Sequence, residues 1–500
     1  MTTPAHNPPP KPVLLLVLDG IRPDVLRSAI EGGETPNLGA LAERGEAVWD
    51  AVSVFPSITP AATAAIATGE APARSGIVGH AWYDARERRV VIYGAMTETV
   101  MATGPIKVFH NNVWRMNRDD LHAATLFETL HDRGFDGACV NFPVRRGPHT
   151  HPIRMKTVEN YRKNGRYLGS SVEGPKEYFM GDLFYSRETG FNGRKASGGL
   201  RRSVGINDEY ASRIGAMLVR ERSAPFNLVY FFKGDSVAHH HGLAAQREWL
   251  RTADGYVGRI FAAAGGVDRL LEDYAVLALS DHGHAPLLPG HRRVDLRRVL
   301  GLKVSSGIKA RFGRNDDAVV VPNGRSALIY LREGLRPGPL AEGLVGRRGV
   351  DLAAWAEDGW ASVLGAGGLL RFRPGTGPAD PFGRSWELDG DPRALDLDVS
   401  SGQVLYGDYP DALERLWGCL HTPRCGDLVL SAEPGYTFGE VSGGYHKASD
   451  HGSLHAEDSR VFVLAGGFGE GARAPRRITD VALMLLGHFG AGRPAEPSVV

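Results

Sequence analysis

Apolar runs alternate with amphipathic helical stretches along much of this chain. Residues 13–18 are apolar at every position and are followed directly by Asp19, as expected of a central parallel strand that is buried on both faces. The runs 226–232 and 274–279 are also largely apolar, and a helical stripe of apolar residues lies between them. This alternation predicts an α/β fold with a mostly parallel central sheet between helices.

Shorter signals extend the same pattern. The sequence TLFE at residues 125–128 is a capping box, and it predicts a helix that leads into a strand over 137–142. Near the C-terminus, a strand is predicted over 460–465 and a last helix begins near Thr479.

Two stretches interrupt the alternation. Residues 145–202 are rich in Arg, Lys, Gly and Tyr without a clear period, which predicts either a surface insertion or a lid over the active site. Residues 295–393 give mixed signals, and we expect an inserted α+β segment there. The catalytic core is then expected to comprise residues 11–144, 203–294 and 394–500.

Composition narrows the classes of function and location. The formal net charge of +1 gives no broad basic field, so specific nucleic-acid binding is not predicted. The run 13–18 is too short for a signal-peptide core or a membrane span, and we predict no membrane partner. Three cysteines form an odd, sparse set that fits a reducing compartment, so we expect unpaired thiols and a cytoplasmic location.

An alanine-rich stretch offers a candidate nucleophile. Pro60 opens it and Gly69 closes it, which predicts a short buried helix with Thr59 as its N-cap. There the hydroxyl faces unpaired backbone N–H groups and the positive end of the helix dipole, which favour an alkoxide and a bound phosphate. An ordinary capping threonine is the commoner explanation of such a stretch alone.

Potential metal ligands in other segments favour the interpretation of Thr59 as a nucleophile over that of an ordinary capping residue. They lie where predicted strands or loops end, and they are Asp19, Asp235, His239, Asp281, His282 and His451. Asp235 and His239 are one helical turn apart, so a helix there would place both on one face. Three carboxylates, three imidazoles and one hydroxyl suffice for two metal ions, and the mixture of His and Asp suits zinc better than magnesium.

Basic residues near the predicted strand ends are candidates for binding a substrate phosphate. Arg145 and Arg146 follow one strand directly, and Lys233 follows another. A phosphomonoester dianion would need such extra cations.

Together these motifs resemble the alkaline phosphatase superfamily and are most similar to its type I phosphodiesterase and nucleotide pyrophosphatase branch. The segments that carry the resemblance are Leu18-Asp19-Gly20, Phe55-Pro56-Ser57-Ile58-Thr59, residues 235–242, Ser280-Asp281-His282-Gly283 and His451-Gly452. They appear in the family's order, and they leave both predicted insertions uncovered. The resemblance implies an alkaline-phosphatase-like core.

The resemblance also implies a ligand set and a mechanism. One metal would be held by Asp19, Thr59, Asp281 and His282, and the second by Asp235, His239 and His451. Thr59 would attack phosphorus and form a phosphothreonine intermediate that water releases.

One residue departs from the family pattern. Such enzymes usually carry Gly-Asn after the nucleophile, and the asparagine amide helps to hold a phosphoryl oxygen, whereas this chain has Gly79-His80. An imidazole can also donate a hydrogen bond and, if protonated, supply a charge. His80 is therefore a candidate catalytic residue, with a structural histidine that faces away as the alternative.

Three functions remain open. The first is a two-metal hydrolase of small phosphodiesters or nucleotide pyrophosphates. The second is a phosphomonoesterase that uses the same metals and Thr59. The third is a protein that binds a phosphorylated ligand through its metals without turnover. The sequence does not determine the oligomeric state.

Overall fold

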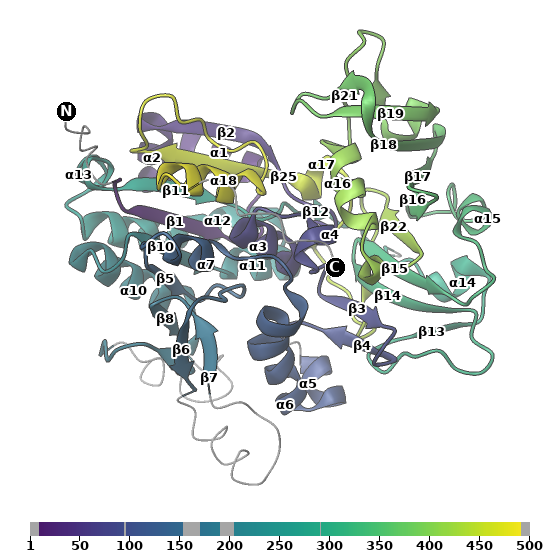
Figure 1. Cartoon of the computed structure of the whole chain (residues 1–500), viewed down its shortest axis with the longest axis horizontal. Helices are drawn as coiled ribbons and strands as arrows, with labels where there is room; N and C mark the ends of the chain where they lie inside the picture. The colour runs from purple at the N-terminus through teal and green to yellow at the C-terminus, as the bar shows by residue number, and fades with distance from the viewer. Residues whose placement is uncertain (1–9, 95–96, 154–170, 191–204, 291, 492–500) are drawn as a thin grey trace, which may run out of the picture.

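The computed structural model describes residues 10–94, 97–153, 171–190, 205–290 and 292–491 (Figure 1). An eight-stranded sheet has the order β2-β25-β11-β1-β10-β5-β8-β9. Its strands are β1 (Val13–Leu18), β2 (Glu46–Val52), β5 (Gly137–Val140), β8 (Glu177–Met180), β9 (Phe184–Tyr185), β10 (Phe226–Phe231), β11 (Ala275–Leu279) and β25 (Arg460–Gly466). The pairs that β1 makes with β10 and β11 are parallel, as are β10–β5 and β5–β8. The predicted α/β fold with a mostly parallel central sheet is confirmed.

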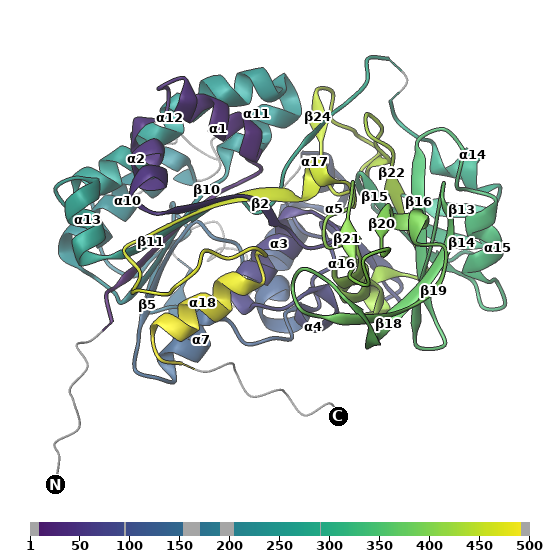
Figure 2. The same cartoon turned by 90° about the horizontal axis from the view of Figure 1, so that it is seen from above.

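Helices cover both faces of this sheet (Figure 2). One layer holds α1 (Pro23–Glu31), α2 (Pro36–Arg44), α10 (Asp208–Glu221), α12 (Leu243–Ala262) and α13 (Val267–Asp273). The other holds α3 (Thr59–Thr68), α7 (Leu126–His131) and α18 (Asp480–His488). Because side chains alternate along a strand, the odd-numbered residues of β1 pack into the core that contains α3, and the even-numbered ones pack into the core that contains α12. This explains why the run 13–18 is apolar throughout.

The parallel strands bring three loops to one edge of the sheet. Asp19 follows β1, α11 (Lys233–His241) follows β10, and Asp281 lies two residues beyond β11. Since β1 lies between β10 and β11, the carboxyl ends of all three strands are neighbours. Ligands bind at such strand ends in open α/β sheets.

Part of the stretch 145–202 joins the central sheet. Its described residues form a hairpin of β6 (His149–Pro152) and β7 (Ser171–Gly174), followed by β8, which pairs with β5, and by β9. The prediction of an insertion or lid also covers residues 154–170 and 191–204, which lie outside the described residues.

A second, nine-stranded sheet accounts for most of the stretch 295–393. Its order is β13-β14-β15-β22-β16-β17-β18-β19, and β23 pairs with β14. Its strands are β13 (Val304–Ser306), β14 (Ala318–Gly324), β15 (Ser326–Leu331), β16 (Val350–Glu357), β17 (Trp360–Gly365), β18 (Gly368–Ala379), β19 (Ser385–Gly390), β22 (Leu428–Ala432) and β23 (Gly439–Glu440). The helices α14 (Leu296–Leu300) and α15 (Pro337–Glu342) accompany it. Because β22 and β23 come from residues beyond 393, this sheet draws on two of the predicted segments, and the domain division stays a prediction.

Further short elements lie outside the two large sheets. They are α4 (Pro72–Ser75), β3 (Ala81–Asp84), β4 (Arg89–Ile92), α5 (Thr97–Thr103), α6 (Pro105–His110), a π-helix (Asn111–Asp120), β12 (Ala285–Pro286), α16 (Ala412–Leu420), β24 (Ser449–Asp450) and α17 (Ala456–Ser459). No helix within the described ranges has the length and apolarity needed to cross a membrane.

Candidate active site

The candidate nucleophile lies at the start of α3. Thr59 is the first helical residue and Ile58 is the N-cap, so the prediction of Thr59 as N-cap was wrong by one position. Ile58 keeps an extended backbone, and the helix makes no side-chain cap hydrogen bond. The Thr59 hydroxyl instead lies 3.0 Å from His282 Nε2. It therefore points toward the predicted metal ligands.

Asp19, Asp281 and His282 form the first cluster around this hydroxyl. His282 Nε2 lies 3.3 Å from Asp19 Oδ1 and 3.8 Å from Asp281 Oδ2. The other oxygen of each carboxylate is held, since the Tyr230 hydroxyl donates to Asp19 Oδ2 and the Gly20 N–H donates to Asp281 Oδ1 at 3.0 Å. Asp19 Oδ1 and Asp281 Oδ2 are buried, and within the described part of the chain neither has a hydrogen-bond donor. Two such oxygens beside an imidazole suit a divalent cation.

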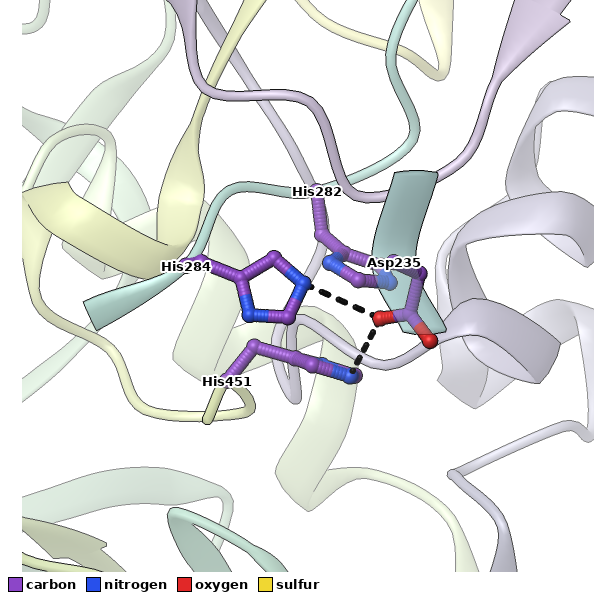
Figure 3. A group of neighbouring side chains, drawn as sticks. All are labelled: Asp235, His282, His284 and His451. Carbon is purple, nitrogen blue, oxygen red and sulfur yellow. Dashed lines mark hydrogen bonds and ion pairs between the residues drawn. The ribbon is translucent and has the colours of Figure 1, made fainter. Parts of the chain in front are cut away.

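Asp235 is the centre of the second cluster. Its Oδ1 atom lies 3.4 Å from His451 Nε2 and 3.0 Å from His284 Nε2 (Figure 3). The same atom lies 3.2 Å from His239 Nε2. Ligands about 2.0–2.1 Å from a tetrahedral zinc ion lie roughly 3.3 Å from one another. The Asp235 oxygen therefore lies at a zinc-ligand separation from each of these imidazole nitrogens, and Asp235, His284 and His451 each offer a ligand atom within 4.8 Å of the others.

The predicted histidine ligands are oriented by the backbone. In each, Nδ1–H donates to a carbonyl oxygen: His239 to Ser449 at 3.0 Å, His282 to Gly283 at 3.0 Å and His451 to Ser57 at 2.8 Å. A neutral imidazole that carries its proton on Nδ1 presents a lone pair on Nε2. All three Nε2 atoms therefore face the clusters as potential ligands.

The pKa values of the clustered side chains show that these carboxylates repel one another in the absence of a bound cation. Burial, followed by the charge of Asp235, raises the pKa of Asp19, and burial together with Asp19 raises the pKa of Asp281 to about 7. Burial lowers the pKa of His239, but the attraction of Asp235 outweighs it and raises that pKa to about 10. Bound cations would relieve the repulsion among these carboxylates and displace such protons.

Residues 13–454 match the family model of type I phosphodiesterase / nucleotide pyrophosphatase. The chain belongs to this family. It is therefore a phosphoester hydrolase of the alkaline phosphatase superfamily, as the resemblance predicted, and the family is metal-dependent. Among curated proteins, none matches the sequence.

Solved structures support the fold. Murine ectonucleotide pyrophosphatase / phosphodiesterase 5 superposes with a TM-score of 0.58 at 14% identity, over 98% of both chains. Phosphonoacetate hydrolase from Sinorhizobium meliloti 1021, in complex with phosphonoformate, superposes with a TM-score of 0.57 at 18% identity, over 96% of both chains. At these identities the likeness shows the alkaline-phosphatase-like fold alone.

His284 is a site residue that the sequence analysis did not single out. It is fully buried, and its Nδ1 atom lies 3.2 Å from the Ser449 hydroxyl rather than from a carbonyl. Because a hydroxyl can donate to Nδ1, the His284 Nε2 atom can carry a proton and donate it to Asp235. A weak signal was available in the sequence, since His284 follows the predicted ligands Asp281 and His282 closely in the same loop.

The two arginines expected to bind substrate make other contacts in this family member. Arg145 is buried, and its guanidinium donates to the carbonyl oxygens of Val113 and Pro143 and lies 5.2 Å from the centre of the Tyr178 ring. Arg146 donates to both Glu128 oxygens. It also donates to the carbonyl oxygens of Asn117, Leu121 and Ala123. These contacts favour structural roles for both residues.

Lys233 and His80 keep the freedom to meet a substrate. Lys233 is exposed at the first position of α11, two residues before Asp235, and its Nζ donates to Ser236 Oγ at 3.3 Å. His80 is partly buried directly before β3. Burial, together with the nearby His451, lowers the pKa of His80 to about 3. His80 is therefore neutral near pH 7. It can donate a hydrogen bond, but it does not supply the positive charge that a protonated imidazole would carry.

Proposed function

We propose that this family member hydrolyses small phosphodiesters or nucleotide pyrophosphates, with Thr59 as nucleophile and two zinc ions as cofactors. The observation that carries the proposal is the contact of 3.0 Å between Thr59 Oγ1 and His282 Nε2, beside the unpaired oxygens of Asp19 and Asp281. Thr59 is the first helical residue rather than the N-cap, so its hydroxyl is not engaged as a helix cap and faces His282 instead.

The two clusters supply the ligands in this proposal. Asp19, Thr59, Asp281 and His282 would hold one cation. Asp235, His239 and His451 would hold the other, with His284 as the residue that orients Asp235. Bound cations would supply positive charge to the attacking hydroxyl and to the phosphoryl oxygens.

Hydrolysis would proceed in two consecutive displacements at phosphorus. Thr59 Oγ forms a bond to phosphorus as the bond to the leaving oxygen breaks, which gives a phosphothreonine. Water then attacks phosphorus and releases Thr59. The N-terminus of α3 favours the negative charge on the phosphoryl group, and the imidazole of His80 would donate to a phosphoryl oxygen in place of the usual asparagine.

A diester is favoured over a monoester by the charges around the site. A monoester dianion carries one more negative charge than a diester, yet Arg145 and Arg146 are engaged elsewhere and His80 is neutral, so Lys233 alone of these four candidates could supply the extra charge. An inactive form of murine ectonucleotide pyrophosphatase / phosphodiesterase 5, which shares the fold, binds AMP. This observation is consistent with a nucleotide ligand.

We also propose a cytoplasmic location, which the three free, buried cysteines support.

The decisive experiment compares kcat/KM for bis-p-nitrophenyl phosphate and p-nitrophenyl phosphate with the zinc-loaded protein. We expect a ratio well above one. A ratio well below one would replace the diesterase with the phosphomonoesterase. Binding of both esters without turnover by protein that carries its full metal content would leave the metal-dependent binder as the function.

A further inference from the structure

A second group of potential metal ligands lies at the opposite edge of the central sheet. His131 is the last residue of α7, Asp136 precedes β5 directly, and His149 is the first residue of β6. Because β5 runs parallel to β10, the residue before β5 lies at the amino end of the strands, whereas Asp235 follows their carboxyl ends. This group, here called the β5-edge cluster, is therefore separate from the candidate active site.

The three side chains of the β5-edge cluster converge on one oxygen atom. Asp136 Oδ1 lies 2.9 Å from His131 Nδ1 and 3.3 Å from His149 Nε2. The two rings are nearly perpendicular, with centres 5.1 Å apart. One nitrogen from each ring and one Asp136 oxygen all lie within 4.8 Å of one another. These separations are close to those of ligands that share a tetrahedral zinc ion.

Lys176 occupies the other oxygen of the same carboxylate. Its Nζ lies 2.9 Å from Asp136 Oδ2, which leaves Oδ1 facing the two imidazoles. A carboxyl group paired with an ammonium is ionised at neutral pH, as a metal ligand must be.

We propose that His131, Asp136 and His149 bind a divalent transition-metal ion, with zinc as the probe of choice. Two imidazoles and one carboxylate form a ligand set that suits zinc, copper or nickel better than calcium or magnesium. The side chains are between 26% and 40% exposed, so water can complete the coordination.

The position of the β5-edge cluster suggests what such an ion does. His131 and Asp136 lie at the two ends of the connection between α7 and β5. His149 is the first residue of the β6–β7 hairpin. The ion would therefore fasten the base of this hairpin to the edge of the central sheet. A bound ion that prefers the folded chain adds stability in proportion to the logarithm of its concentration over Kd.

Zinc binding to full-length variants tests this proposal. Chelator-treated protein is titrated with zinc by calorimetry, and the bound metal is counted after gel filtration. We expect the double variant His131→Ala/His149→Ala to bind about one zinc ion fewer per chain than the wild type, and either single variant to weaken that site by about tenfold or more. Equal zinc counts in the double variant and the wild type would overturn the proposal.

Lys176→Ala provides the matched control. In a metal site the ammonium competes for the carboxylate, so its removal should tighten zinc binding by about two- to fivefold. In a plain network of hydrogen bonds, its removal would leave zinc binding unchanged or weaker, and that result would also contradict a metal site. Asp235→Asn should lower zinc binding at the candidate active site and leave the β5-edge cluster unaffected, which separates this proposal from the proposed catalytic function.

Discussion

At the scale of single residues, the site depends on which atom of each polar side chain is already engaged. The three predicted histidine ligands are held through Nδ1, and the carboxyl groups of Asp19 and Asp281 are each held through one oxygen. What remains are the Nε2 atoms of the histidines and one oxygen of each carboxylate, which face the two ligand clusters. The hydrogen bonds to surrounding residues therefore determine which atoms are available to bind a metal ion.

Replacement of the hydroxyl tests the role of Thr59. Thr59→Ala should lower kcat by at least about a thousandfold, because covalent catalysis needs the oxygen, while zinc content and Tm stay close to those of the wild type. Thr59→Ser keeps the oxygen and should retain measurable turnover with a trapped phosphoserine visible by mass spectrometry. Wild-type activity in the alanine variant would remove Thr59 from the mechanism.

His284 should act through Asp235. Loss of an outer hydrogen-bond partner typically weakens metal binding by about 10- to 100-fold, and we expect His284→Ala to weaken the second zinc ion by this factor in competition with a chelator. His284→Gln can still donate to Asp235 and should restore part of the affinity. His240→Ala, at an exposed position on the same helix as Asp235, is the matched control and should leave zinc affinity unchanged. Unchanged affinity in His284→Ala would contradict the orienting role.

At the scale of elements, α11 carries two ligands, and its start is anchored by a residue from α10. Asp208 is buried, and its carboxylate accepts hydrogen bonds from the backbone N–H groups of Phe232 at 3.0 Å and Lys233 at 3.2 Å. These are among the N–H groups that a helix start leaves without intrahelical partners. Asp208 thus sets the position from which α11 presents Asp235 and His239.

The pH dependence of stability should report the burial of the Asp208 carboxyl group, which outweighs the effect of these hydrogen bonds on its pKa. Burial raises the pKa of Asp208 from 3.8 to about 6. The folded chain thus holds this proton more tightly than the unfolded chain does, so the stability it contributes is present below pH 3.8 and is lost as the pH rises through about 6. Relative to Asp208→Asn, the wild type should lose on the order of 2 kcal/mol between pH 4 and pH 7 in denaturant titrations. A constant difference between the two proteins across this range would contradict the shift.

At the scale of the whole molecule, the second sheet positions part of the active site of the first. Arg325 lies in the turn between β14 and β15, and its backbone N–H donates to the carbonyl oxygen of His451 at 2.8 Å. Its guanidinium makes a fully buried ion pair of 2.5 Å with Asp458, and Asp458 accepts from the Ser453 N–H at 2.7 Å. The loop that presents His451 is therefore held from the second sheet.

Disruption of this ion pair should affect both stability and metal binding. Arg325→Met leaves the Asp458 charge buried without its partner, which typically costs about 3–5 kcal/mol, and it should also weaken the zinc ion held by His451. The double variant Arg325→Met/Asp458→Asn removes both charges and should recover much of the lost stability. Full stability of Arg325→Met in denaturant titrations would show that the pair is not needed.

The sequence by itself determined the frame of the site. Apolar runs that end at Asp19 and shortly before Asp281 indicated parallel strands. Because the carboxyl ends of parallel strands meet at one edge of a sheet, Asp19 and Asp281 were expected to lie close together. The one-turn spacing of Asp235 and His239 likewise gave a correct shared helix. These inferences are local, because a strand or a helical turn needs only the residues within it.

Only the tertiary structure decided the partners of long, flexible side chains and of residues distant in the chain. Arg145 and Arg146 follow a strand, as predicted, yet backbone carbonyls and Glu128 take up their donors. His284 became a site residue because Ser449, far along the chain, meets its Nδ1 atom. These contacts join residues 18, 32 and 165 positions apart, so they form only when separate segments pack together, and no local pattern of hydrophobic and polar positions encodes them.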